Sequence, residues 1–339
     1  MPPTSNTSEP RRHHYIPQSL LREFACLDQP KRICVYQKAD PVRAFKTGLL
    51  NVACESDYHT IERADGSPDH STIETALSEI ECHQIGWIHD VVARGSITEE
   101  DRGEVAALIS TYRCRVPQFK EQVERMYQES LHEVGDHVLR RELVPFPEDM
   151  SEPVRQQLAE MIREKGSRAF KITISNAELV KQMMQCAFSD KSIQTHGQMA
   201  FSLGVVEPGA GHLCVSDCPV SAAVVGAPAC HPEMLAPGSP YAEVCLPITR
   251  TACIIAQWKD ELPPFVSLGA VAVKELNRRT AAMASRFVFA PEESRDLRVA
   301  VEQAVRRTAG YGLQRIPAPK GAYLVAYTQP VASGMKLAP

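Results

Sequence analysis

The spacing of apolar residues predicts several helices in the first half of this 339-residue chain. Apolar residues recur three or four positions apart over 71–95, as one buried face of a helix requires. The same spacing runs from 98 to 127, where Pro117 predicts a kink because proline has no backbone N–H to donate. The sequences at 71–74 and 175–178 fit the capping box, in which a serine and a glutamate bond the first turn of a helix.

Short apolar runs bounded by glycine and proline predict strands, and these become frequent after residue 200. The predicted strands are residues 32–38, 56–62, 200–206, 211–216, 242–248, 252–258, 287–290 and 322–328. Helices and strands do not alternate regularly, so a parallel sheet with crossover helices is not expected. We predict an α+β fold in which a helical N-terminal half packs on a mainly antiparallel sheet from the C-terminal half. Residues 322–328 are expected to close that sheet.

The polar stretches suggest how the chain is divided. Residues 1–10 are rich in proline, serine and threonine, which predicts a disordered tail. Residues 11–330 are then expected to form a single α+β domain, with a helical insertion around 140–200. The candidate domain boundary is the polar, proline-containing stretch 140–170.

Composition narrows the class of protein. A net charge of −4 argues against a protein that coats nucleic acid non-specifically. The eleven cysteines are scattered and include no Cys-x-x-Cys pair, which favours free thiols in a reducing compartment. No apolar run approaches 18 residues and the N-terminus has no hydrophobic signal region. We therefore expect a cytoplasmic protein that makes no membrane contact.

The first candidate site is RRHHYIPQSLLREF, residues 11–24. Pro17 is suited to the first turn of a helix, and the free N–H groups of a helix N-terminus attract anions. With two arginines and two histidines beside it, phosphate is the natural ligand. Adjacent residues of an extended chain point in opposite directions, so at most one of His13 and His14 should face a given pocket. In the structural alternative, the histidine bonds a backbone carbonyl and the arginines lie in water.

Other candidates lie far along the chain. Ser216 and Asp217 follow a predicted strand, where the carboxylate could bind a metal or orient a histidine, or simply complete a turn. Glu74 and Glu81 share one helix face but are separated by about 10 Å of rise, too far to share one metal ion. Because capping accounts for Glu74, Glu81 is the better candidate. Arg115 could hold a phosphate, or form a salt bridge to Glu81.

The order of these motifs resembles the domain-of-unknown-function family 4238, which is largely bacterial and fungal. The segments that carry the resemblance are HHYIPQSLLREF, SDYHTIE, IETALSEIE, RCRVPQF, VSDCPV, LPITR and LNRRTAAMASRFVFA, over residues 12–290. The resemblance implies a shared fold and a shared set of polar positions, and it brings no activity with it. The family-like positions are His13, His14, Tyr15, Pro17, Glu74, Glu81, Arg115, Pro117, Ser216, Asp217, Pro219 and Asn277. The chain departs from the family at Val116, Val215 and Cys218, where threonine, threonine and asparagine are commoner.

If these segments converge, we expect a hydrolase that acts on a phosphodiester or nucleotide. His13 or His14 would act as general base or metal ligand, and Asp217 and Glu81 would supply carboxylates. The predicted substrate-binding residues are Arg115, Tyr15, Ser216 and Asn277. A divalent metal ion is a candidate cofactor, and the sequence leaves its identity open.

The rival hypothesis is a non-catalytic anion-binding or regulatory protein, for example in a bacterial defence or toxin system. Its partner would be a phosphate-containing small molecule or a nucleic acid, and protein partners stay open. A third alternative, cysteine-dependent transfer, requires an exposed cysteine beside a histidine. Acid, base and phosphate-binding groups around an open cleft would favour catalysis, whereas the same residues buried in mutual salt bridges would favour a scaffold.

Overall fold

The computed structural model describes residues 11–140, 149–225, 241–259, 261–305, 311–318, 321–328, 331–332 and 337. The predicted disordered tail at 1–10 lies outside the described residues, as does part of the predicted loop after residue 140. The fold is α+β, with helices mostly in the N-terminal half and sheets mostly in the C-terminal half. The helices are α1 (Gln18–Arg22), α2 (Thr72–Arg94), α3 (Arg102–Cys114), α4 (Pro117–Arg140), α5 (Glu152–Lys165), α6 (Asn176–Phe188), α7 (Asp190–Gly197), α8 (Ala270–Met283) and α9 (Arg295–Val305).

A six-stranded sheet forms the centre of the C-terminal half. Its order is β12 (Phe265–Leu268), β7 (Ala200–Val206), β11 (Ala252–Gln257), β10 (Ala242–Thr249), β9 (Ser221–Val224) and β16 (Val331–Ala332). The three inner pairings are antiparallel and the two outer ones are parallel. Every residue of β10 and β11 is buried, because both faces of these strands are covered.

A second, four-stranded antiparallel sheet joins the two halves of the chain. Its order is β3 (Asp40–Gly48), β2 (Arg32–Gln37), β13 (Phe287–Ala290) and β8 (Val215–Ser216). The pairing of β2 with β13 places Val35 opposite Phe289. The predicted strands at 32–38 and 287–290 are therefore confirmed, and they are neighbours.

Three small two-stranded sheets complete the described part of the fold. They are β1 (Arg12–His14) with β4 (Cys54–Ser56), β5 (Ile61–Glu62) with β6 (Pro68–Asp69), and β14 (Tyr311–Ala318) with β15 (Gly321–Thr328). The prediction that residues 322–328 close the main sheet is wrong, because β15 pairs with β14 in a hairpin of its own. Asp57, which has a left-handed φ of 57°, follows β4, so the strand predicted at 56–62 does not continue to β5.

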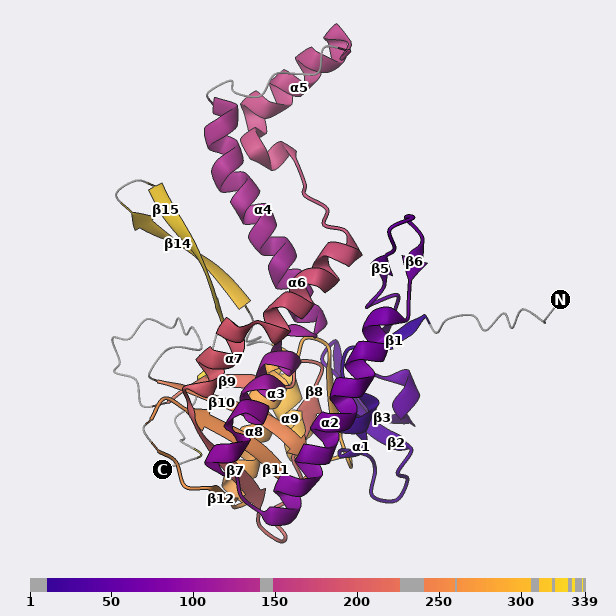
Figure 1. Ribbon diagram of the computed structural model, residues 1–339, viewed down its shortest axis with the longest axis vertical. Helices are drawn as coiled ribbons and strands as arrows, with labels where there is room; N and C mark the ends of the chain where they lie inside the picture. Colours follow the sequence, from indigo (N-terminus) through magenta and orange to yellow (C-terminus); the bar gives the residue numbers. More distant parts are fainter. Residues whose placement is uncertain are drawn as a thin grey trace, which may run out of the picture.

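One hydrophobic cluster holds the N-terminal segment against the rest of the molecule. Tyr15, Leu20 and Phe24 are fully buried in the same cluster as Ile254 of the six-stranded sheet. Figure 1 shows α2 and α3 beside the sheets, whereas α4 and α5 extend away from them as an arm. The helices α4–α7 fall between α3 and β7, and the domain boundaries proposed from the sequence stay a prediction. Within the described residues, no helix has the length and apolar character needed to cross a membrane.

Two local expectations are corrected, and both corrections matter for the site. Pro117 does not kink one long helix: α3 ends at Cys114 and α4 begins at Pro117, because a residue that precedes proline is biased away from helical geometry. Arg115 therefore lies in the break between two helices. The capping box predicted at 71–74 is also wrong, since the Asp69 carboxylate accepts the N–H groups at the start of α2 instead.

Candidate functional site

The first site segment is held in place by a short β-ladder. β1 pairs with β4 so that His13 lies opposite Glu55. The N–H of Asp57 then donates to the Arg11 carbonyl at 2.7 Å, and the N–H of Thr60 donates back to the Asp57 carbonyl at 3.1 Å. This turn brings residues 57–60 beside β1, and it carries a histidine that sequence reasoning had not selected, His59.

The same turn is also fixed from α4 and α6. Asn176 donates from its side-chain amide to the carbonyls of Asp57 and Thr60 at 2.9 and 3.1 Å. Lys120 donates to the Tyr58 carbonyl at 2.6 Å and to the Asn176 side chain at 2.8 Å. Burial lowers the pKa of Lys120 to about 8. The position of His59 is therefore set by three separate elements.

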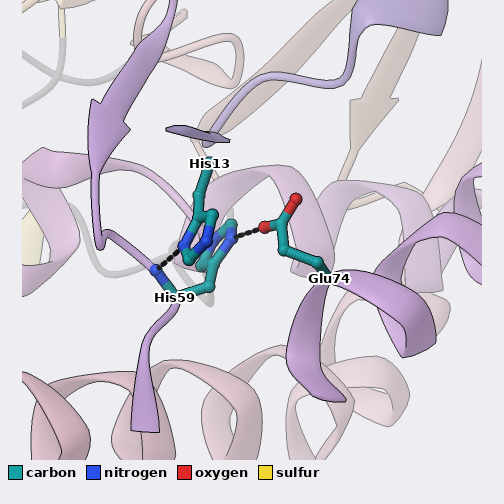
Figure 2. Close-up of side chains that lie close together, drawn as sticks. All are labelled: His13, His59 and Glu74. Carbon is teal, nitrogen blue, oxygen red and sulfur yellow. Dashed lines mark hydrogen bonds and ion pairs between the residues drawn. The ribbon is translucent and has the colours of Figure 1, made fainter. Parts of the chain in front are cut away.

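His13, His59 and Glu74 form the centre of the site, which we call the histidine–glutamate cluster. The N–H of His59 donates to Nδ1 of His13 at 2.8 Å, and Nδ1 of His59 contacts the Glu74 carboxylate (Figure 2). The two imidazole rings are stacked, with centroids 5.8 Å apart and planes within 8°. Each residue offers one possible ligand atom, and these three atoms lie within 4.8 Å of one another.

Hydrogen bonding and burial decide the protonation state of His59. Burial lowers its pKa well below the ordinary value, and the positive charges of Arg115 and Lys120 lower it further. The ring is therefore neutral near pH 7, with Nδ1–H directed at Glu74 and a lone pair on Nε2. That Nε2 atom is buried and has no hydrogen-bond partner among the residues that the structure describes. Burial also raises the pKa of Glu74, against the opposing charges of His13 and Arg115.

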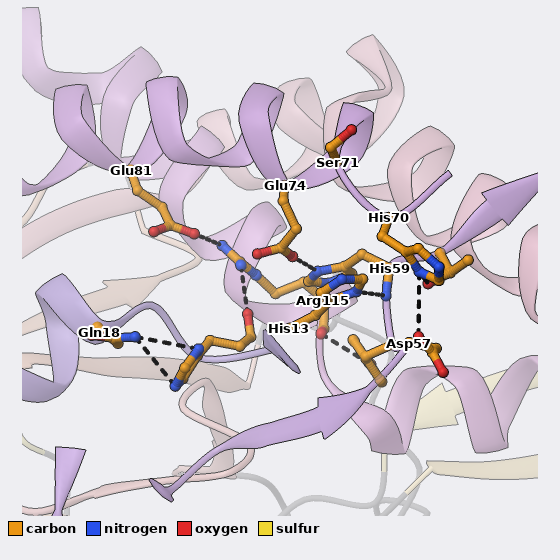
Figure 3. Close-up of polar contacts among 12 residues, drawn as sticks. His13, Gln18, Asp57, His59, His70, Ser71, Glu74, Glu81 and Arg115 are labelled. Atoms are coloured by element: carbon orange, nitrogen blue, oxygen red, sulfur yellow. Dashed lines mark hydrogen bonds and ion pairs between the residues drawn. The ribbon is translucent and has the colours of Figure 1, made fainter. Parts of the chain in front are cut away.

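Arg115 forms a second buried group beside the cluster. Its guanidinium donates to the Glu81 carboxylate at 2.8 Å and to the His14 carbonyl at 2.8 Å (Figure 3). Its own carbonyl accepts the Tyr58 hydroxyl at 3.1 Å. The salt bridge to Glu81, one of the two roles considered for Arg115, is thus present. The Arg115 Nε atom is buried and has no partner within the described part of the chain.

His14 and Tyr15 lie at the edge of this arrangement. The His14 ring is partly buried and contacts the Gln18 amide at 3.4 Å and the Leu50 backbone, and burial lowers its pKa. Only His13 of the adjacent pair enters the cluster, as the alternation of an extended chain predicted. Tyr15 is buried against the Tyr58 ring, and burial raises the pKa of its hydroxyl.

The remaining predicted residues lie around β8 and form a second group. We call it the β8 group, and its members are Ser216, Asp217 and Asn277. The carboxylate of Asp217 accepts the N–H groups of Ser285, Arg286 and Phe287 at 2.8, 2.6 and 3.1 Å. Burial raises the pKa of Asp217 to about 6. In the described part of the chain, none of its hydrogen bonds reaches the histidine–glutamate cluster.

Asn277 and Ser216 of the β8 group are bonded in the same way. The Asn277 side chain accepts the Cys214 N–H at 2.9 Å and donates to the His212 carbonyl at 2.8 Å. The Ser216 hydroxyl donates to the Cys218 carbonyl at 2.7 Å. Each of these side chains orders the backbone around β8.

The pairing of His59 with Glu74 could not be predicted from the local sequence pattern, for two reasons. His59 stood alone in SDYHTIE without metal-ligand spacing, and Glu74 was assigned to helix capping. The signal that could have found them was the presence of Asp69, a good helix cap, ahead of Ser71. If Asp69 caps the helix, Glu74 is free to turn toward the loop.

Comparison with known proteins adds one result. Neither the curated proteins nor the solved structures contain a match to the chain. A family model described as "Protein of unknown function (DUF4238)" matches residues 12–294, which include the histidine–glutamate cluster, Arg115 and the β8 group. Since the match covers most of the chain, the protein belongs to this family.

Proposed function

We propose that this chain is a hydrolase that acts on a phosphodiester or a nucleotide, with His59 as the group that activates water. The observation that carries the proposal is the His59–Glu74 pair, whose Nε2 lone pair is left without a partner. A neutral imidazole held by a carboxylate on one nitrogen can take a proton on the other. The neighbouring carboxylate then stabilises the imidazolium that forms.

The charges around the cluster support a phosphate substrate. The positive charges of Arg115 and Lys120 both lower the pKa of His59, so the electrostatic potential that they produce at the ring is positive. The same field would stabilise the negative charge that develops when a phosphate ester is attacked. Glu74, whose side chain is 30% exposed, is the member of the cluster that reaches solvent, so we place the approach of substrate on its side.

The proposal changes the roles expected of several residues. Glu81 and the His14 carbonyl position Arg115 by hydrogen bonding. The β8 group supports the fold, and the Tyr15 ring packs against Tyr58. The carboxylate partner of the base is Glu74, in place of the Asp217 expected from sequence.

The test is hydrolysis by the full-length chain of bis(4-nitrophenyl) phosphate and of a panel of nucleotides, with and without added divalent metal. The His59→Gln variant should lose roughly 10²- to 10⁴-fold in rate, the usual contribution of a general base. His83→Gln is the matched control, because His83 is an exposed histidine on α2. Equal turnover by the wild type and His59→Gln would contradict the proposal.

A second candidate is an anion-binding protein without turnover. It is favoured by the burial of His13 and His59 and by the two hydrogen bonds that already engage Arg115. This candidate predicts that phosphate or a nucleotide binds to the wild type while no hydrolysis is detected. Binding measured by calorimetry in the same samples therefore separates the two functions.

A further inference from the structure

We propose that His13, His59 and Glu74 bind one divalent transition-metal ion. Zn²⁺ is the ion used to test this proposal. The proposal rests on the site of the proposed function and gives that site a cofactor: with the ion bound, the Nε2 lone pair of His59 is used for ligation, so the ion would activate water in place of the free base. Its test is binding, which is measured separately from hydrolysis.

The first observation is the arrangement of donors. One ligand atom from each of the three residues lies within 4.8 Å of the other two. The residues come from β1, from the turn after β4 and from the first turn of α2, so only the folded chain assembles them (Figure 2). In the part of the chain that the structure describes, this is the one group of three or more histidine, cysteine or acidic residues with such spacing.

The second observation is the incomplete hydrogen bonding of His59. Its ring is fully buried, yet Nε2 has no partner. Buried polar atoms without a partner are rare, and each calls for an explanation such as an ion.

The donor set selects the class of ion. Two imidazole nitrogens and one carboxylate suit Zn²⁺, Fe²⁺ and related ions, whereas Mg²⁺ and Ca²⁺ prefer oxygen ligands. Two neutral histidines and one carboxylate would leave a bound divalent ion with a net charge of +1. Three protein ligands also leave a coordination position for water or for an anionic substrate.

His13 is expected to be the weakest of the three ligands. Its Nδ1 accepts the His59 N–H, so the neutral ring carries its proton on Nε2. To ligate an ion, this ring must lose that proton or turn over about its Cβ–Cγ bond. For His59 the Nε2 lone pair is ready, and Glu74 must turn from the Nδ1 side of that ring to reach the ion. His13 alone has to change its protonated nitrogen, and this difference gives an order of effects that a merely structural cluster would not show.

The experiment uses the full-length chain, stripped with a chelator and titrated with Zn²⁺ by calorimetry. The wild type should bind about one Zn²⁺ per chain. Glu74→Gln and His59→Ala should each weaken binding by more than the roughly 10- to 100-fold typical of second-shell changes, and His13→Ala by less than either. Glu79→Gln and His83→Gln, at exposed positions of α2, should bind as the wild type does.

The thermal unfolding temperature provides a second measurement, which guards against variants that fail to bind Zn²⁺ because they are misfolded. Zn²⁺ should raise the thermal unfolding temperature of the wild type and leave that of Glu74→Gln, a near-isosteric change, unchanged. No Zn²⁺ binding by the wild type, or equal binding by Glu74→Gln, would overturn the metal site. Zn²⁺ binding without hydrolysis would overturn only the proposed function, and hydrolysis that persists in chelator without Zn²⁺ binding would overturn only the metal site.

Discussion

The histidine–glutamate cluster and the β8 group contain similar residues but complete their hydrogen bonds differently. In the β8 group, Asp217 is surrounded by three backbone N–H groups and Asn277 bonds backbone atoms at both ends of its amide. In the cluster, His13 accepts the backbone N–H of His59, the His59 side chain bonds that of Glu74, and among the described residues Nε2 of His59 has no partner. Nε of the adjacent Arg115 also has no partner among them.

This difference separates residues that stabilise the fold from residues that could bind a ligand. A buried polar side chain whose bonds all go to the backbone fixes the path of the chain and has no capacity left for a ligand. A buried lone pair without a partner costs stability, so it is a reasonable place to look for a bound group. Residue type and position in a motif do not distinguish a structural polar residue from a ligand-binding one. The hydrogen-bond partners of each side chain do.

The largest effect on stability is expected from Glu81→Ala. This change removes the carboxylate from Arg115 and leaves a buried guanidinium with the His14 carbonyl as its remaining acceptor. Breaking a buried pair in this way costs 3–5 kcal/mol, and because Glu81 is 21% exposed we expect the lower end, about 3 kcal/mol. Urea unfolding of the wild type and the variant measures the loss.

Glu79→Ala is the control for this change, because Glu79 is an exposed glutamate of the same helix. It should lie within about 0.5 kcal/mol of the wild type. If Glu81→Ala is equally mild, the buried pair contributes nothing to stability, and Arg115 is available for a ligand.

The sequence predicted the parts of the fold that depend on local pattern. The strands at 200–206, 242–248 and 252–258 were recovered because each is a short apolar run between turns. The hairpin of β14 and β15 was missed because an apolar run does not specify which strand it pairs with. Strand partners depend on the whole topology, which no window of residues contains.

The site was predictable only in part, for a related reason. Of the predicted site residues, Arg115 bonds Glu81 and the His14 carbonyl, and His13 belongs to the neighbouring cluster. Their position at the start or end of an element, or on one helix face, can be read from local pattern. Their partner His59 depends on the left-handed turn at Asp57 and on its anchor at Asn176 of α6. Those contacts join residues more than 100 positions apart, and no local motif records them.

The second prediction concerns the pH dependence of stability, and it tests the β8 group. Burial raises the pKa of Asp217 from 3.8 to about 6, so the folded chain holds this proton more tightly than the unfolded chain. The contribution of Asp217 to stability is therefore present below about pH 4 and is lost as the pH rises through 6. The difference is worth about 3 kcal/mol at most.

Asp217→Asn isolates this contribution, because other titrating groups are common to both proteins. The difference in unfolding free energy between wild type and variant should change by up to about 3 kcal/mol between pH 4 and pH 7, to the disadvantage of the wild type. Parallel curves for the two proteins would contradict the raised pKa. Zn²⁺ affinity at a fixed pH should be the same in both.

The smallest effect is expected from His14→Gln. This substitution removes the imidazole ring of His14 and keeps its backbone carbonyl, so it tests the two parts of the residue separately. The His14 carbonyl accepts Arg115, and the substitution keeps that contact. The contacts of the ring to Gln18 are long, at 3.4 Å, and glutamine can replace its hydrogen bond to the Leu50 backbone, so the substitution should change the unfolding free energy by less than about 0.5 kcal/mol. Hydrolysis and Zn²⁺ binding should also persist in this variant. A loss of either activity with unchanged stability would place the His14 ring in the reaction, and the cluster would then extend across both histidines of the N-terminal motif.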